Sequence, residues 1–174
     1  LQGALKVLVP IDVFVIDPSN ESLAIAAQRA TEIDHNHTIK YQTDWNNLPA
    51  IFDIVIIATN SNIREKAINQ LLEKHEVRYL ILEKVVFPEI DAYKRVDELF
   101  NKHNIQVWVN HPRRMFESYL ELKKELSNTP KVFQVTGGNW GLGCNGLHFI
   151  DLFAFLTSSK VCSIDTQWVD EEIN

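Results

Sequence analysis

Cysteine, methionine and long hydrophobic runs are nearly absent from this sequence. Its 174 residues include two cysteines and one methionine. Two cysteines without a CxxC pair exclude a disulfide framework and give no zinc or redox motif, so we expect a reduced, cytoplasmic setting. The longest apolar run, 54–58, is far shorter than the roughly 18 residues of a membrane span. We therefore predict no membrane partner.

An excess of positive charge is also absent. The chain has 17 Lys and Arg residues against 23 Asp and Glu residues, which gives a net charge of -6. Proteins that bind nucleic acids or anionic membranes need a basic face, so we predict no nucleic-acid partner. With 45% hydrophobic and 23% charged residues, the composition is that of an ordinary soluble globular protein.

Glycine is scarce, and most of it lies in one place. All but one of the 6 glycines fall between residues 137 and 146. The segment 141–146 matches the GxGxxG spacing of dinucleotide-binding loops, but it lies in the second half of the chain and no βαβ unit follows it. We interpret it as a flexible substrate-side loop, in which small residues let the backbone approach a ligand closely.

Short apolar, β-branched segments alternate with helix-forming segments over the first 110 residues. Ser19 or Asn20 is expected to cap the first helix. The alternation of strand and helix is the signature of an α/β fold with a doubly wound parallel sheet and right-handed crossovers. We predict strands at 11–16, 38–42, 52–59, 79–82 and 105–109, and helices at 21–30, 62–74 and 90–103.

The pattern changes after Pro112. We predict a helix at 115–126, a strand with one solvated face at 132–135 and an apolar helix at 147–156. The chain is thus expected to contain an α/β domain at 1–112, followed by the start of an α+β domain at 113–174.

Polar and ionisable residues follow most of the predicted strands. In an open parallel sheet, ligands bind at the carboxyl ends of the strands. Asp17 occupies the place where dinucleotide-binding domains carry the acid that accepts hydrogen bonds from the adenosine ribose. A simpler interpretation of Asp17-Pro18-Ser19 is a turn that caps the next helix. The spacing leaves both interpretations open.

Three segments, in order along the chain, resemble one known family. They are the strand 54–59, the sequence Leu82-Glu83-Lys84, and the helical segment 146–152. They are similar to the Gfo/Idh/MocA oxidoreductases, the family of glucose-fructose oxidoreductase and inositol dehydrogenase, and the resemblance covers nearly the whole chain. It implies a Rossmann-type domain whose first strand and glycine-rich loop precede Leu1, followed by the beginning of a substrate domain.

The Glu83-Lys84 pair resembles the EKP motif of that family, whose lysine contacts the substrate hydroxyl and the cofactor. The resemblance implies a catalytic role for Lys84, because a nearby ammonium group lowers the pKa of a sugar hydroxyl and favours loss of its proton. Val85 stands where proline is usual. The sequence leaves open whether the turn keeps the cis peptide often found there.

His148 resembles the catalytic histidine of the family, which exchanges the hydroxyl proton. The family carries an acid four positions earlier, where this chain has Cys144, followed by Asn145. A thiol or an amide cannot stabilise an imidazolium as a carboxylate does. Either Asn145 orients His148, or the proton relay differs from that of the sugar dehydrogenases. Asp151 is expected to be structural or to hydrogen-bond His148.

The remaining residues receive cofactor or substrate roles from the same resemblance and from their places after the strands. The guanidinium groups of two arginines after the strand at 105–109 suit an acidic substrate group, although arginines that only face solvent are equally consistent with the sequence. A tryptophan in the glycine segment suits either an anchor for the loop or a surface on which a sugar ring stacks. A pair of loop histidines at 35 and 37 lacks further ligands, so we assign no metal. The cofactor-binding candidates are Asp17, Thr59, Asn60, Ser61 and Glu83. The substrate-binding candidates are Asn110, Arg113, Arg114, Trp140 and Asn145.

The resemblance implies an NAD-dependent oxidoreductase. It would move a hydride between NAD(H) and a hydroxyl-bearing carbon of a sugar, a cyclitol or a related compound. Because the Asp17 carboxylate would repel a 2'-phosphate, we expect NAD rather than NADP. The alternative is a non-catalytic ligand-sensing or scaffold protein that keeps the fold. We expect a homo-oligomer at full length and no activity from this segment alone.

Overall fold

The computed structural model describes residues 1–126, 131–139, 141–160, 163 and 165. The chain forms two compact units, Leu1–Ala50 and Ile51–Asn174, and each is described by itself. The predicted domain boundary at 112/113 lies inside the second unit and remains a prediction. No helix of the described residues is long and apolar enough to cross a membrane.

The first unit is a small βαβ arrangement. After a short 3-10 helix, η1 (Ala4–Lys6), strand β1 (Asp12–Ile16) leads to helix α1 (Asn20–Ala30) and strand β2 (Thr38–Gln42). The two strands pair in parallel, from Asp12 opposite Thr38 to Ile16 opposite Gln42. Ser19 caps α1, because its side chain accepts a hydrogen bond from the backbone N–H of Ser22 at 3.2 Å.

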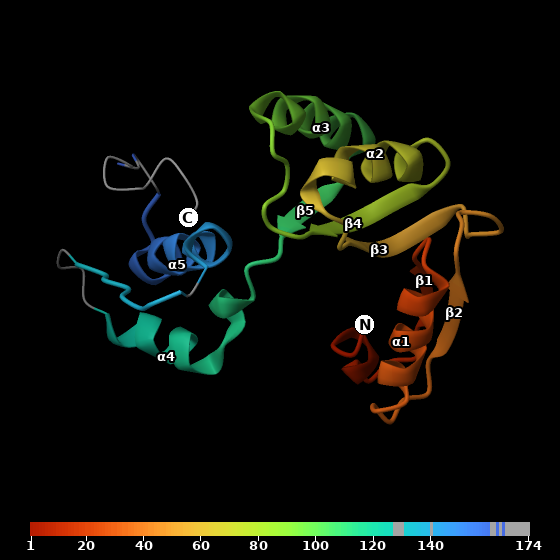
Figure 1. Ribbon diagram of the computed structural model, residues 1–174, viewed down its shortest axis with the longest axis horizontal. Coiled ribbons are helices and arrows are strands. Elements are labelled where there is room, and N and C mark those ends of the chain that lie inside the picture. The colour runs from red at the N-terminus through yellow and green to blue at the C-terminus, as the bar shows by residue number, and fades with distance from the viewer. Residues whose placement is uncertain (127–130, 140, 161–162, 164, 166–174) are drawn as a thin grey trace. The chain divides into compact units, whose positions relative to one another are not determined.

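The second unit is built on a parallel sheet in the order β3-β4-β5. Its strands are β3 (Ile51–Ile57), β4 (Glu76–Leu82) and β5 (Gln106–Val109). Helices α2 (Ser61–Leu72) and α3 (Ile90–His103) lie on one face of this sheet (Figure 1). The covered face supplies the core, whose fully buried side chains include Ile68, Leu71, Leu80, Leu82 and Val96.

The opposite face of the β3-β4-β5 sheet is apolar and largely exposed. Ile56 pairs with Ile81, and Ile81 with Trp108, so these three side chains share that face. Ile56 is 55% exposed and Trp108 is 50% exposed, and the Trp108 ring contacts Tyr79 at a centroid distance of 5.8 Å. A sheet face of this composition normally packs against another layer.

Two helices follow the sheet in the second unit. The 3-10 turn η2 (Pro112–Met115) leads to α4 (Glu117–Glu125), and α5 (Leu142–Thr157) begins within the glycine cluster. Lys123 joins α4 to α5, because its Nζ donates to the Phe155 carbonyl at 2.6 Å and lies 3.9 Å from the centroid of the Phe155 ring. This pairing fixes α5, which carries His148, against α4.

The predicted mixed α/β fold with parallel strands is confirmed, and the strands and helices of the first 110 residues occur where the alternation places them. They form two parallel sheets, one in each unit, and no described strand joins β1 to β3. The alternation predicts which segments are strands. It does not fix which strands pair, because pairing depends on neighbours that lie far apart in the sequence.

Two predictions for the region after Pro112 are wrong. Residues 132–135 are not a strand: Val132 is 97% exposed, and no described strand lies beside the segment to complete a ladder. The glycine cluster is not wholly a loop, because α5 begins at Leu142 and includes Gly143 and Gly146. A helix satisfies its backbone N–H and C=O groups internally, whereas a strand needs a partner strand. The glycine-containing segment can therefore form a helix by itself, but residues 132–135 cannot form a strand by themselves.

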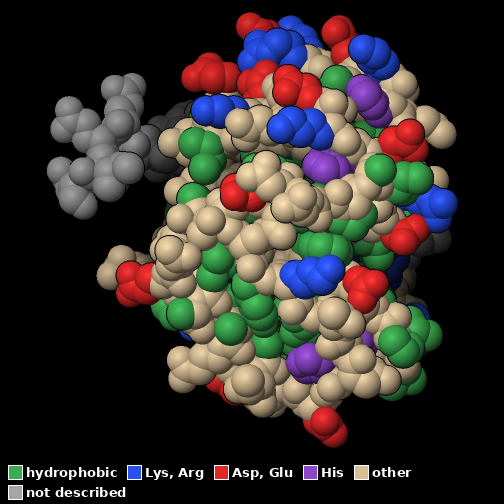
Figure 2. Space-filling view, turned by 90° about the vertical axis from the view of Figure 1, so that its right-hand side faces the viewer, with side chains coloured by type: hydrophobic (Ala, Val, Ile, Leu, Met, Phe, Trp, Pro, Cys, Tyr) green, Lys and Arg blue, Asp and Glu red, His purple; other side chains and the backbone are tan. Residues whose placement is uncertain are grey.

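Charged side chains of both signs are mixed on the surface. On the face shown in Figure 2, Lys and Arg side chains lie among Asp and Glu side chains, and hydrophobic side chains are visible between them. This mixture on the face shown accords with the net charge of -6 that the sequence gives for the chain.

Candidate functional site

A hollow of about 600 Å³ lies at the carboxyl ends of β3 and β4. This is the edge where ligands bind in open parallel sheets. The hollow joins four of the predicted cofactor-binding residues to the predicted catalytic lysine. Its lining residues are Ala58, Thr59, Asn60, Ser61, Asn62, Arg64, Glu83, Lys84, Val85 and Cys144.

Arg64 holds the two loops of this hollow together. Its guanidinium donates to the carbonyl of Thr59 after β3, and to the carbonyls of Val85 at 2.5 Å and Val86 at 2.7 Å after β4. The side chain is buried, with a relative exposure of 2%. Burial lowers the pKa of Arg64, and the charges of Glu83 and Tyr93 oppose that effect. The cation is therefore a structural brace under the loops.

Lys84 reaches from the end of β4 to the first turn of α5. Its Nζ donates to the carbonyl of Cys144 at 2.6 Å, and the peptide bond from Lys84 to Val85 is cis although Val85 is not proline. The preceding residue, Glu83, accepts a hydrogen bond from Asn110 Nδ2 at 2.7 Å. The turn therefore has the cis bond that the sequence left open, and Asn110 orients the neighbouring carboxylate.

His148 lies on α5, one turn after Cys144, and its ring meets that of His111. The ring centroids are 5.4 Å apart, with an interplanar angle of 81°, an edge-to-face contact. The Nδ1 atoms of both histidines are buried, and no described residue hydrogen-bonds them. Burial lowers the pKa of His148, as do the positive charges of Lys84, His111 and Arg113, while Asp151 raises it.

The two predicted arginines have different partners. Arg114 makes a bidentate ion pair with Asp151, through Nε to Oδ2 at 2.6 Å and Nη2 to Oδ1 at 2.5 Å. The guanidinium of Arg113 lies 4.2 Å from the centroid of the Phe149 ring. The guanidinium of Arg114 is therefore already paired with a protein carboxylate, and both carboxylate oxygens of Asp151 accept hydrogen bonds from it. The substrate roles of both arginines remain predictions.

Several other predicted residues take local structural positions. Asn60 is the N-cap residue of α2 without a side-chain cap bond, and Ser61 begins that helix. The hydroxyl of Thr59 is buried and has no hydrogen-bond partner among the described residues. Asn145 Nδ2 lies 3.5 Å from the Gly141 carbonyl. Trp140 lies outside the described residues.

Asp17 belongs to the first unit, at the end of β1. Its Oδ1 accepts a hydrogen bond from the backbone N–H of Ser19 at 2.8 Å. This is the geometry of the turn that the sequence offered as the simpler interpretation. The ribose role of Asp17 stays a prediction.

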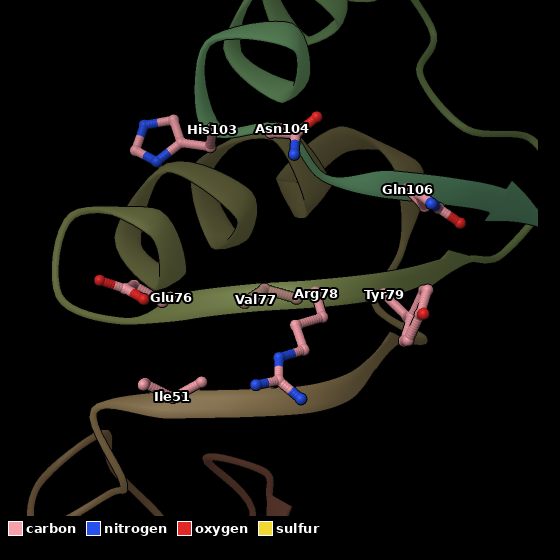
Figure 3. A pocket seen from close by; sticks show the side chains of 8 residues that line it. All are labelled: Ile51, Glu76, Val77, Arg78, Tyr79, His103, Asn104 and Gln106. Carbon is pink, nitrogen blue, oxygen red and sulfur yellow. The ribbon is translucent and has the colours of Figure 1, made fainter.

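A second hollow, of about 480 Å³, opens at the amino ends of β3, β4 and β5. Figure 3 shows its lining side chains, which come from the starts of β3, β4 and β5 and the end of α3. The guanidinium of Arg78 is paired with Asp53 at 2.8 Å. This hollow brings together none of the predicted site residues and lies at the opposite end of the strands.

Solved structures supply the comparison that the sequence alone does not. Neither a protein-family model nor a curated protein matches this chain. A putative myo-inositol dehydrogenase from Sinorhizobium meliloti 1021 is 11% identical, with a TM-score of 0.61 over 87% of this chain and 56% of that one. The WlbA (WbpB) dehydrogenase from Thermus thermophilus, solved with NAD and UDP-GlcNAcA, is 16% identical, with a TM-score of 0.56 over 86% and 63%.

The chain has the fold of the Gfo/Idh/MocA-type dehydrogenases. The super-repressor mutant of Gal80p from Saccharomyces cerevisiae has this fold too, at 15% identity and a TM-score of 0.59 over 87% of this chain and 54% of that one. The chain spans between half and two thirds of the length of these three structures. The resemblance read from the three sequence segments is thus confirmed at the level of fold.

Within this dehydrogenase fold, two residues were not predicted to shape the site. His111 lies beside His148, and Arg64 lies beneath the hollow. The position of His111 close after a predicted strand was a signal in the sequence, but His148, which it contacts, stands 37 positions later. Nothing in the sequence shows that the guanidinium of Arg64 hydrogen-bonds backbone carbonyls. No group of three or more described His, Cys, Asp or Glu residues is placed to hold a metal ion.

Proposed function

We propose that this chain is part of an NAD-dependent oxidoreductase that oxidises a hydroxyl-bearing carbon of a sugar, a cyclitol or a related compound, or reduces the corresponding carbonyl. One observation carries the proposal. Lys84 and the helix turn that leads to His148 are joined directly, at the edge of the sheet where dehydrogenases of this fold bind their ligands. This reaction requires two groups from the protein, a cation near the reacting oxygen and a base that accepts the hydroxyl proton.

The residues of the hollow fit the nicotinamide half of NAD. Thr59 and Ser61 supply hydroxyl groups, Asn60 supplies an amide, and the Thr59 Oγ1 is a buried polar atom in need of a partner. The pyrophosphate would need a glycine-rich loop, and the GxGxxG match of this chain is taken up by α5. The chain therefore offers the nicotinamide side of a cofactor site.

Lys84 and His148 divide the proton chemistry between them. The ammonium of Lys84 stabilises the developing alkoxide of the substrate hydroxyl, and neutral His148 accepts the proton, so that the O–H bond breaks as a carbonyl forms. NAD, when bound, takes the hydride from the same carbon. In the reverse direction, His148 returns the proton to the carbonyl oxygen. The lowered pKa of His148 keeps its imidazole neutral and able to accept.

Cofactor binding is the first test, and it needs no substrate. A ligand at 100 times its dissociation constant adds about 2.7 kcal/mol to stability, so NAD is expected to raise the melting temperature of the full-length protein measurably. Lys84→Met should lower that gain, whereas Lys66→Met, which removes an exposed lysine of α2, should not. No stabilisation by NAD or NADP would contradict the enzyme proposal. A clear preference for NADP would contradict the role of Asp17 alone.

A non-catalytic ligand sensor is the second candidate. Cys144 stands where the dehydrogenases carry the acid that orients the histidine, and Gal80p shows that the fold also occurs in a repressor. A panel of sugars and cyclitols with NAD, offered to the full-length protein and followed by NADH fluorescence and by calorimetry, separates the two. Turnover that His148→Gln abolishes supports the enzyme. Binding of cofactor or sugar without any turnover supports the sensor.

A further inference from the structure

The candidate proton acceptor lacks the carboxylate partner that would normally orient and charge-stabilise it. Asp151, whose charge raises the pKa of His148, is engaged in the bidentate pair with Arg114, and Cys144 occupies the position four residues upstream. The group that meets the His148 ring instead is a second histidine, His111, edge to face at 5.4 Å. An imidazole in that place acts on the charge of His148 in the opposite sense to a carboxylate.

We propose that His111 is a positioning residue for proton transfer: the rings of His111 and His148 form one coupled pair that carries at most one positive charge, so that His148 accepts the proton of the substrate while His111 is neutral. This deepens the proposed function and rests on it for the origin of the proton. The coupling itself rests only on the contact between the two rings.

Three features of the structure support a coupled pair. The rings lie close enough that two positive charges would repel strongly in a partly buried site. The Nδ1 atom of each ring is buried without a hydrogen-bond partner among the described residues, so no described acceptor offsets a second proton there. The cations Lys84 and Arg113 face His148 as well, and Asp151 is the one acid acting against them.

The pair explains how a site without the usual acid returns to its starting state. When His148 takes a proton from a substrate hydroxyl, it carries the one charge that the pair accommodates, and His111 stays neutral. The repulsion from Lys84 and Arg113 then favours release of the proton from His148 to water. No oxidant or further reactant is needed for this step beyond the hydride acceptor named above.

Nuclear magnetic resonance titration of the histidine ring protons tests the coupling in the protein without cofactor or substrate. His111→Phe keeps an aromatic ring and removes the charge, so the titration midpoint of His148 is expected to rise by about one pH unit. Because coupling is reciprocal, His148→Phe must move the midpoint of the His111 ring by the same amount in the same direction. His103→Phe, at the exposed end of α3, is the matched control and should move neither.

Each outcome of this titration decides the proposal. An unchanged His148 midpoint in both His111→Phe and His111→Gln, with the ring signals of a folded protein, overturns it. If the His111 variants do not fold, the shift of His111 in His148→Phe carries the decision alone. If the protein shows the coupling but binds no NAD, the coupled pair stands and the proposed enzymatic function is wrong. If it turns over sugar without the coupling, only the proposed role of His111 is wrong.

Discussion

Arg64 places a buried positive charge where its partners are backbone carbonyls. Its guanidinium reaches the carbonyls of Thr59, Val85 and Val86, which belong to two different loops. The planar fork of an arginine spans such a set of acceptors, whereas the single ammonium of a lysine does not. The two loops that line the hollow therefore depend on one side chain.

We expect Arg64→Ala to lower the free energy of unfolding by about 2 to 3 kcal/mol, because it leaves partly buried carbonyls without donors. Arg64→Lys should recover only part of that loss. Urea unfolding measures both. The control is Arg95→Ala, which removes an exposed arginine paired with Glu65, and its effect should be a small fraction of the first. Equal losses for Arg64→Ala and Arg95→Ala would refute the brace.

His148 makes the stability of the protein depend on pH. Its pKa is lowered in the folded state, chiefly by burial, so between that value and the unfolded value of about 6.5 the unfolded chain binds more protons. The contribution of neutral His148 to the free energy of unfolding is therefore complete above pH about 6.5, and it is lost as the pH falls through the folded pKa. His148→Gln should flatten this part of the pH profile in urea unfolding, and His103→Gln should leave it intact. A slope that survives His148→Gln belongs to another group.

At the scale of elements, α5 depends on two glycines in different ways. Gly141 precedes the helix with a φ of 67°, a left-handed conformation that residues with a Cβ seldom adopt. Gly143 lies within the first turn, and no heavy atom stands within 4 Å of a Cβ placed there. The first glycine therefore serves the entry into the helix, and the second leaves the helix less stable than it need be.

The two glycines predict opposite effects of the same substitution. Gly141→Ala should cost about 1 kcal/mol, since the strain lies in the backbone and the nearest atom, Asn145 Nδ2 at 3.5 Å, is in ordinary contact. Gly143→Ala should add about 0.5 to 1 kcal/mol. Thermal unfolding monitored by circular dichroism compares the two. Destabilisation by both would mean that the segment is not helical in solution.

Elements with a strong local signal could be predicted from the sequence, and those that depend on distant partners could not. Helix α3 occupies the predicted range 90–103, because its apolar residues recur with helical spacing and Asn104 ends it in a left-handed conformation. The strand predicted at 132–135 had alternation but no partner. The same holds for the site: Lys84 follows a strand and lies in the hollow, although its catalytic role came from the family resemblance and stays a prediction. The contact of His111 with His148 joins segments that no local pattern connects.

At the scale of the whole molecule, the open face of the β3-β4-β5 sheet exposes apolar side chains to water, which is unfavourable. Ile54 is 60% exposed and Ile56 is 55% exposed, beside Tyr79 and Trp108. Contiguous apolar patches on soluble proteins mark interaction surfaces or sites of aggregation. We expect the isolated chain to associate with itself through this face as its concentration rises.

Ile56→Lys is expected to reduce that association, because a charged side chain on this face resists burial. Sedimentation velocity across a concentration series gives the measurement. Ile90→Lys is the control, since Ile90 is 76% exposed at the start of α3, on the other side of the sheet. If the two variants reduce association equally, net charge and not the face is responsible.

The bond from Lys84 to Cys144 also bears on the order in which the molecule folds. Its ends are 60 residues apart, and α3, β5 and α4 lie between them in the chain. Contacts of such long sequence separation close large loops and form after local ones, because the chain entropy they remove is offset only once the intervening elements are in place. The sheet can thus exist without the site. Lys84 meets the first turn of α5 only at the end of folding, so a chain released or cut before α5 is made keeps the β3-β4-β5 sheet and lacks the contact on which the proposed proton chemistry rests.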